Sequence, residues 1–163
     1  MMYKIGQGQD SHAFAIDKNK KLVLGGVVIE KARGLSARSD GDVVLHSLCN
    51  ALSSAIGGDS LGTWADELCL KRGVRDSRVY VEKIMERVSE VGFVVGNVSV
   101  SIEAKYPHIS LEVIQAMKNK IASLLDIQPE MVGITFTSGD GLTSFGRGKG
   151  IQAFGIVLLE KHD

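Results

Sequence analysis

The chain has 163 residues, of which 44% are hydrophobic and 23% charged, with 19 basic residues against 19 acidic ones. This composition predicts a single globular domain over residues 1–163, and the balanced charge argues against nucleic-acid binding. No apolar stretch is long enough for a membrane span, and the N-terminus does not resemble a signal peptide, so we expect a cytoplasmic protein without a membrane partner.

The first third of the chain predicts two strands, over residues 3–8 and 22–30, because both stretches are apolar and rich in β-branched residues. The run Lys18-Asn19-Lys20-Lys21 lies between them and predicts an exposed hairpin turn. Residues 31–41 are rich in glycine, serine and charge, which is typical of a loop.

A helix is expected after this loop. Ser39 or Asp40 can cap it, and Asp42 follows Ser39 by three residues, as in a capping box. The helix ends at Gly57-Gly58. Its apolar residues recur at helical spacing: Leu45, Leu48, Leu52, Ala55 and Ile56.

The second half of the chain alternates helices and strands. Residues 59–75 carry mixed signals and predict a surface segment. Periodicity then predicts helices over 76–91 and 108–125 and strands over 93–104, 131–137 and 151–159. The resulting order, ββααβαββ, predicts an α+β fold with a mixed β-sheet covered by helices on one face.

Asp10-Ser11-His12 is a candidate metal-binding motif. In an extended chain, residues two apart project to the same side, so Asp10 and His12 can bind one ion. A catalytic zinc site takes three protein ligands and keeps one position open. His46 is the candidate third ligand, although its local sequence also allows a bond to a backbone carbonyl or to Asp42. Cys49 is a conceivable further ligand.

Residues 138–150 form the most glycine-rich stretch. Hydroxyls and exposed backbone N–H groups there can bind phosphate oxygens, and Asp140 can hold a hard cation such as Mg²⁺. The alternative is a long hairpin connection that needs glycine for its turns. The stretch is not a Walker A loop, because Gly146 is followed by Arg147-Gly148 instead of Lys-Ser or Lys-Thr.

Several short motifs occur in the order and spacing of one known family. They are Asp10-Ser11-His12, the run Ser39-Asp40-Gly41-Asp42-Val43-Val44-Leu45-His46, Gly58-Asp59, Asp76-Ser77-Arg78, Gly96-Asn97-Val98 and Gly146-Arg147-Gly148-Lys149-Gly150-Ile151. Together they closely resemble the 2-C-methyl-D-erythritol 2,4-cyclodiphosphate synthases. The resemblance covers essentially the whole chain, and the run ending at His46, paired with Asp10-x-His12, is highly specific.

The resemblance implies a phosphorus–oxygen lyase of the non-mevalonate isoprenoid pathway. Such an enzyme converts 4-diphosphocytidyl-2-C-methyl-D-erythritol 2-phosphate to the 2,4-cyclodiphosphate and CMP, by attack of the 2-phosphate on the β-phosphate. The resemblance also implies a homotrimer with active sites between subunits. Asp10, His12 and His46 would bind Zn²⁺, and Asp140 would hold a second divalent ion, Mg²⁺ or Mn²⁺.

The same resemblance assigns contacts to the substrate. Arg38 and Ser138 take catalytic positions, Thr137 and Ser138 contact the diphosphate, and Asp59 contacts the ribose of a nucleotide bound to the adjacent subunit. The full set of implied substrate-binding residues is Asp10, Ser11, His12, Arg38, Ser39, Asp59, Ser60, Gly62, Thr137, Ser138, Gly139, Asp140 and Arg147.

The chain departs from the family pattern at several positions. Arg38 stands where histidine is usual, and it can contact phosphate but cannot lose a proton at working pH. Asp140 is shorter than the usual glutamate, and the loop at residues 60–62 is one residue longer. Lys149 replaces a common glutamate, which adds positive charge at the mouth of the trimer's central channel, where some members hold an isoprenoid diphosphate. Residues 105–108 replace the usual Pro-Lys of the cytosine pocket.

Two other functions are compatible with the same residues. A zinc phosphoesterase would use metal-bound water as its nucleophile, with the same three ligands. A metal-stabilised nucleotide-binding module, or an inactive relative of the synthases, would bind without turnover. A closed site with four ligands, including Cys49, would favour the binding module.

Overall fold

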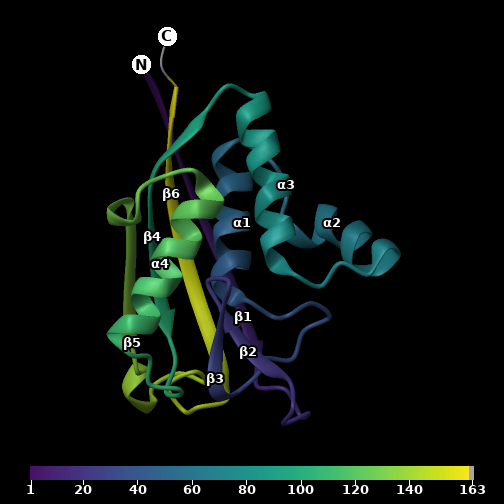
Figure 1. Cartoon of the computed structure of the whole chain (residues 1–163), viewed down its shortest axis with the longest axis vertical. Coiled ribbons are helices and arrows are strands. Elements are labelled where there is room, and N and C mark those ends of the chain that lie inside the picture. Colours follow the sequence, from purple (N-terminus) through teal and green to yellow (C-terminus); the bar gives the residue numbers. More distant parts are fainter. Residues whose placement is uncertain (162–163) are drawn as a thin grey trace.

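The structure is a computed structural model that describes residues 1–161, and it is built around a four-stranded sheet (Figure 1). The strand order is β1 (Met2–Ala13), β6 (Gly150–Lys161), β4 (Val94–Glu103) and β5 (Val132–Thr137). β6 runs antiparallel to both of its neighbours, whereas β4 and β5 are parallel. The prediction of an α+β fold with a mixed sheet is therefore confirmed.

Three helices, α1 (Val43–Ala55), α3 (Ser77–Glu90) and α4 (Leu111–Leu125), lie on one side of this sheet (Figure 1). In β4, Val98 and Val100 are buried beneath the helices, whereas Ser99 is exposed on the opposite face. Within one chain, the helices cover one sheet face and leave the other open, as predicted. None of the helices in residues 1–161 is long and apolar enough to cross a bilayer.

The predicted strand over residues 22–30 is wrong, because these residues form a hairpin. β2 (Lys21–Leu24) and β3 (Val27–Arg33) pair antiparallel in a separate two-stranded sheet. Gly25 and Gly26 make the turn, both with positive φ, which matches the need of tight hairpin turns for glycine. Since β1 pairs with β6, the lysine run connects two sheets and is not the turn of a hairpin.

The N-cap of α1 is Asp42, not Ser39 or Asp40 as predicted. Its carboxylate accepts hydrogen bonds from the backbone N–H groups of Val44 and Leu45, at 3.1 and 3.0 Å. It also accepts from Gly25 and Gly26, at 2.9 and 2.6 Å. One fully buried carboxylate thus fixes both the start of α1 and the β2–β3 turn.

The segment over residues 59–75 contains regular structure that the sequence did not predict. α2 (Leu61–Asp66) continues into the π-helical η1 (Glu67–Lys71), and the two project from the body of the molecule (Figure 1). Two further short helices, η2 (Pro129–Met131) and η3 (Gly139–Gly141), flank β5. Without η1–η3 the observed order is βββαααβαββ, so the predicted order lacked one strand and one helix.

β1 and α1 are in direct backbone contact at Gly6 and Gly8. A Cβ atom at Gly6 would lie 2.0 Å from the carbonyl oxygen of Ala51, and one at Gly8 would lie 2.1 Å from that of Ser47. No larger residue fits at either position without a shift of the helix. Because Asp10 continues β1 beyond Gly8, this contact also sets how closely Asp10 approaches α1.

Candidate metal centre and substrate cavity

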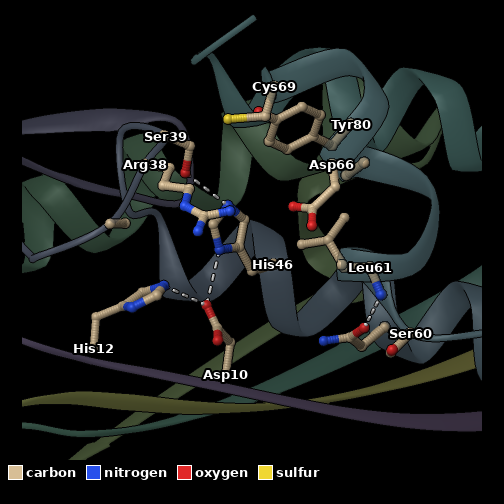
Figure 2. A pocket seen from close by; sticks show the side chains of 14 residues that line it. Asp10, His12, Arg38, Ser39, His46, Ser60, Leu61, Asp66, Cys69 and Tyr80 are labelled. Atoms are coloured by element: carbon tan, nitrogen blue, oxygen red, sulfur yellow. Dashed lines mark hydrogen bonds and ion pairs between the residues drawn. The ribbon is translucent and has the colours of Figure 1, made fainter. Parts of the chain in front are cut away.

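Asp10, His12 and His46 converge between β1 and α1 (Figure 2). Asp10 Oδ2 lies 2.8 Å from His46 Nδ1 and 3.2 Å from His12 Nε2. One ligand atom from each of the three side chains lies within 4.8 Å of the others, close enough to share one ion. The fold therefore brings together the three predicted ligands, and His46 pairs with Asp10, not with Asp42.

The chemistry of this donor set fits zinc. One carboxylate oxygen and two imidazole nitrogens are ordinary zinc ligands, and three protein ligands leave a fourth position open. Burial by itself raises the pKa of Asp10, but hydrogen bonds and charge interactions with His12 and His46 outweigh it and hold that pKa well below its usual value. Asp10 is thus ionised at neutral pH, as a metal ligand must be.

Cys49 does not belong to this group. It is fully buried in the hydrophobic core, and burial raises the pKa of its thiol well above the usual value. Among residues 1–161, Asp10, His12 and His46 form the one cluster of three or more metal-binding side chains. The closed four-ligand site that would have favoured a binding module is therefore not formed.

A cavity of about 410 Å³ opens beside the three ligands (Figure 2). Its volume lies in the range of small-molecule sites. Four other predicted residues line it: Arg38, Ser39, Ser60 and Gly62. The sequence missed seven more lining residues, which are Ala37, Asn50, Leu61, Ala65, Asp66, Cys69 and Tyr80.

Asn50 connects α1 to α2 beside this cavity. It stands four residues after His46 on α1, so helical spacing could have identified it. Its side-chain oxygen accepts a hydrogen bond of 2.7 Å from the backbone N–H of Leu61, at the start of α2. Cys69 and Tyr80 come from other helices, and no sequence pattern indicated them.

The loop that carries Arg38 and Ser39 is held by Lys20. The Lys20 Nζ donates hydrogen bonds of 2.9 and 3.0 Å to the carbonyl oxygens of Ala37 and Ser39. Burial lowers the pKa of Lys20 from its usual value, with a smaller opposing effect from Asp40. A residue expected in an exposed turn therefore positions one wall of the cavity.

Asp59 lies outside the metal-side cavity, in a neighbouring hollow of about 340 Å³. That hollow is lined by Gln7, Gly8, Gln9, Asn50, Ser54, Gly58, Asp59 and Ser60. Because Asn50 and Ser60 line both spaces, the two are adjacent. Ser11 lines neither of them, and in β1 its side chain projects away from those of Asp10 and His12.

The predicted phosphate-binding loop begins at the β5 edge of the sheet, away from the metal ligands, and ends at β6 beside β1. Thr137 ends β5, and Ser138, Gly139 and Asp140 follow it, with β6 and β4 between β5 and β1. Three strand spacings amount to roughly 14 Å. None of these residues lines the metal-side cavity, so one chain does not bring the two halves of the predicted site together.

Asp140 and Arg147 make their side-chain hydrogen bonds within this loop. Asp140 adopts a φ of 44°, and its carboxylate accepts a hydrogen bond of 2.9 Å from Ser138 Oγ. Arg147 donates from Nη1 to the carbonyl oxygens of Gly141 and Leu142, at 3.2 and 3.0 Å. Asp140 and Arg147 are both exposed, so they can be reached by a ligand or by another subunit.

Comparison with known proteins gives one consistent result. The sequence model of the YgbB family matches residues 3–160. A curated relative from Chlamydia muridarum, named 2-C-methyl-D-erythritol 2,4-cyclodiphosphate synthase, is 43% identical over 97% of this chain and 88% of its own length.

Solved structures agree with this match. An IspF from Plasmodium falciparum in complex with CDP is similar with a TM-score of 0.85 and 26% identity, covering 99% of this chain and 97% of that one. The bifunctional IspDF from Campylobacter jejuni gives a TM-score of 0.89 and 31% identity, covering 99% of this chain and 43% of the bifunctional one.

Proposed function

The chain belongs to the YgbB family, whose curated relatives are named 2-C-methyl-D-erythritol 2,4-cyclodiphosphate synthase, and on this premise we propose that it catalyses that cyclisation. The substrate is 4-diphosphocytidyl-2-C-methyl-D-erythritol 2-phosphate, and the products are the 2,4-cyclodiphosphate and CMP. The protein is then a phosphorus–oxygen lyase of the non-mevalonate isoprenoid pathway. The observation that carries the proposal is the Asp10, His12 and His46 cluster at the edge of a substrate-sized cavity.

The reaction joins two phosphate groups of one molecule. An oxygen of the 2-phosphate attacks the β-phosphorus, and the bond from that phosphorus to the oxygen of the α-phosphate breaks and releases CMP. A phosphate monoester has a second pKa of about 6 and is already anionic at neutral pH. The site therefore needs no strong general base, which is compatible with an arginine at position 38.

The main task of the protein is to hold two repelling phosphate groups together. Asp10, His12 and His46 would bind zinc, which when bound supplies a Lewis acid for a phosphate oxygen. Arg38 is exposed at the cavity wall, and its guanidinium can form paired hydrogen bonds with a phosphate. Ser39 lines the same wall and offers a hydroxyl.

The proposal includes a homotrimer, because the predicted site is incomplete in one chain. Thr137, Ser138 and Asp140 of one subunit would face the metal ligands of its neighbour, and Asp140 would hold the second ion, Mg²⁺ or Mn²⁺. The open face of the sheet supports such contacts, since Ile5 and Ile156 lie on it with 73% and 48% of their surface exposed.

Product analysis tests this function. Purified protein is incubated with the substrate, zinc and magnesium, and the products are followed by phosphorus NMR and mass spectrometry. We expect stoichiometric CMP and a cyclic diphosphate, both lost with a chelator and in His46→Ala. Ser47→Ala is the matched control, because Ser47 is the next residue and its hydroxyl bonds only a backbone carbonyl, that of Val44.

The rival functions give different products. A linear diphosphate or free phosphate would identify a hydrolase that uses metal-bound water. Substrate that binds without turnover would identify a binding module or an inactive relative. Either result would overturn the cyclisation proposal.

A further inference from the structure

The imidazole of His46 contacts two different sets of partners through its two nitrogens. Nδ1 faces Asp10, as described above. Nε2 lies 2.8 Å from the hydroxyl oxygen of Ser77, the first residue of α3. Ser77 is fully buried, so water has no access from that side and the hydroxyl is the near neighbour of Nε2.

Ser77 is in turn bound to Asp40. Its hydroxyl donates a short hydrogen bond to Asp40 Oδ1, and its backbone N–H donates one of 3.0 Å to Oδ2. The backbone N–H of Asp42 also donates to Asp40 Oδ1, at 3.2 Å. Both carboxylate oxygens are thus held in place by the chain around them.

The direction of these hydrogen bonds follows from the chemistry of the groups. An ionised carboxylate can only accept, so the single hydroxyl proton of Ser77 points to Asp40. The Ser77 oxygen is then left with lone pairs toward His46, and Nε2 must be the donor. A neutral imidazole that donates from Nε2 has its lone pair on Nδ1, the nitrogen that faces Asp10 and the metal site.

We propose that Asp40 and Ser77 are positioning residues that orient His46 as a metal ligand, through the relay Asp40 to Ser77 to His46 Nε2. This rests on the proposed function, in which His46 Nδ1 binds zinc. Partners of this kind on the far nitrogen fix the ring and its tautomer in metal sites generally. Here the partner is a serine whose own hydroxyl is oriented by a carboxylate.

Ser39 is a weaker alternative partner. Its hydroxyl oxygen lies 3.4 Å from His46 Nε2, a longer contact than that of Ser77. The same oxygen accepts a hydrogen bond of 3.2 Å from the backbone N–H of Gly41. Distance therefore favours Ser77 as the acceptor for the Nε2 proton, and the relay links the ligand on α1 to the N-terminus of α3.

The test measures zinc affinity by competition with a chelating dye, in Ser77→Ala, Asp40→Ala and the double variant. We expect each single variant to bind zinc roughly 10–100-fold more weakly, the usual effect of losing such a partner. If Asp40 acts through Ser77, the double variant will be no weaker than Ser77→Ala, since the two changes interrupt one relay. Ser77→Thr keeps the hydroxyl and should keep most of the affinity.

Ser47→Ala is the matched control, because it removes another buried serine hydroxyl and we expect its zinc affinity to stay within about 2-fold of the wild type. Urea unfolding of each metal-free variant separates lost stability from lost affinity. Equal zinc affinity in Ser77→Ala and Ser47→Ala would overturn the relay. If Ser77→Ala does not fold, NMR of the zinc-loaded wild type tests the relay instead. A His46 Nε2 proton that makes no hydrogen bond to Ser77 would also overturn the relay.

The two proposals fail in different ways. A wild type that binds no zinc would overturn the metal site and the relay together. A wild type that binds zinc and forms the cyclic product, with an unaffected Ser77→Ala, would overturn the relay alone.

Discussion

Arg38 is the residue at which, by the resemblance described above, the chemistry of this chain departs most from the family pattern. It lines the cavity beside the metal ligands on a loop that Lys20 holds in place. Arginine keeps its proton under working conditions, so at this position it can stabilise charge but cannot act as a base. Its contribution to catalysis should therefore be electrostatic.

We expect Arg38→Ala to lower kcat/KM by roughly 100-fold, the effect typical of removing one donor to a developing charge. Arg38→His restores the usual family residue and should stay within about 10-fold of the wild type, because the attacking phosphate is already anionic. Steady-state release of CMP measures both variants. An Arg38→Ala enzyme with unchanged kcat/KM would show that this side chain does not touch the reacting phosphates.

At the scale of residues, the sequence predicted which three side chains converge but few of the residues around them. The period of a strand was enough to place Asp10 and His12 on one side of the chain. The approach of His46 depends on Gly6 and Gly8, where β1 contacts α1 through backbone alone. Ser77 could not be assigned a role, because its contact with His46 exists only after α1 and α3 have packed.

At the scale of elements, the β1–α1 contact should be the least tolerant part of the fold. We expect Gly8→Ala to destabilise the protein by about 3 kcal/mol or more, because its Cβ would meet the backbone of α1. The same displacement should weaken zinc binding by separating Asp10 from His46. Gly133→Ala is the control, since a Cβ there has its nearest neighbour at 3.7 Å. Urea unfolding compares the two, and equal stabilities would contradict the close contact.

Asp42 should contribute more to the stability of the folded protein than an ordinary helix cap does. Asp42→Ala removes the cap of α1 and also leaves the N–H groups of Gly25 and Gly26 without their acceptor. A cap contributes about 1 kcal/mol, and each buried unsatisfied donor costs about 1–3 kcal/mol, so we expect a loss of roughly 3 kcal/mol or more.

The matched control for Asp42 is Ser110→Ala, which removes the exposed N-cap of α4. It should cost about 1 kcal/mol. Thermal or urea unfolding measures both variants. Similar losses in the two would mean that the link between α1 and the β2–β3 turn adds nothing to stability.

The elements that the sequence misjudged have identifiable physical causes. The run over residues 22–30 is apolar on both sides of Gly25-Gly26, so it was interpreted as one continuous strand. The glycine pair itself could have indicated the turn. α2 and η1 were missed because Ala65 is their one buried residue among those described. Without an apolar stripe, helical periodicity has nothing to detect.

At the scale of the whole molecule, the order of the strands in the sheet could not be predicted from the sequence. The last strand, β6, lies between β1 and β4 and is paired with both. Such long-range pairing depends on the packing of the complete chain. The same order places the metal ligands on β1 and Thr137 at the β5 edge of the sheet, so the proposed function requires that subunits meet.

We expect Ile5→Lys to convert a trimer into monomers, because it places a charge on the open apolar face of the sheet. Cyclisation should be lost with the trimer, while zinc binding to the single chain persists. Ile16→Lys is the control, since Ile16 is 93% exposed and lies between β1 and β2, outside the four-stranded sheet. Analytical ultracentrifugation reports the assembly, and a trimeric Ile5→Lys would show that subunits meet elsewhere.

The pairing of β1 with β6 has a consequence for protein architecture. Met2 lies opposite Lys161, so the start of β1 and the end of β6 are neighbours. They lie at the end of the sheet away from the metal ligands (Figure 1). A second catalytic domain could be joined at either end without obstructing the cavity. The fold is therefore well suited to gene fusion, in which two enzymes share one polypeptide and are produced in equal amounts.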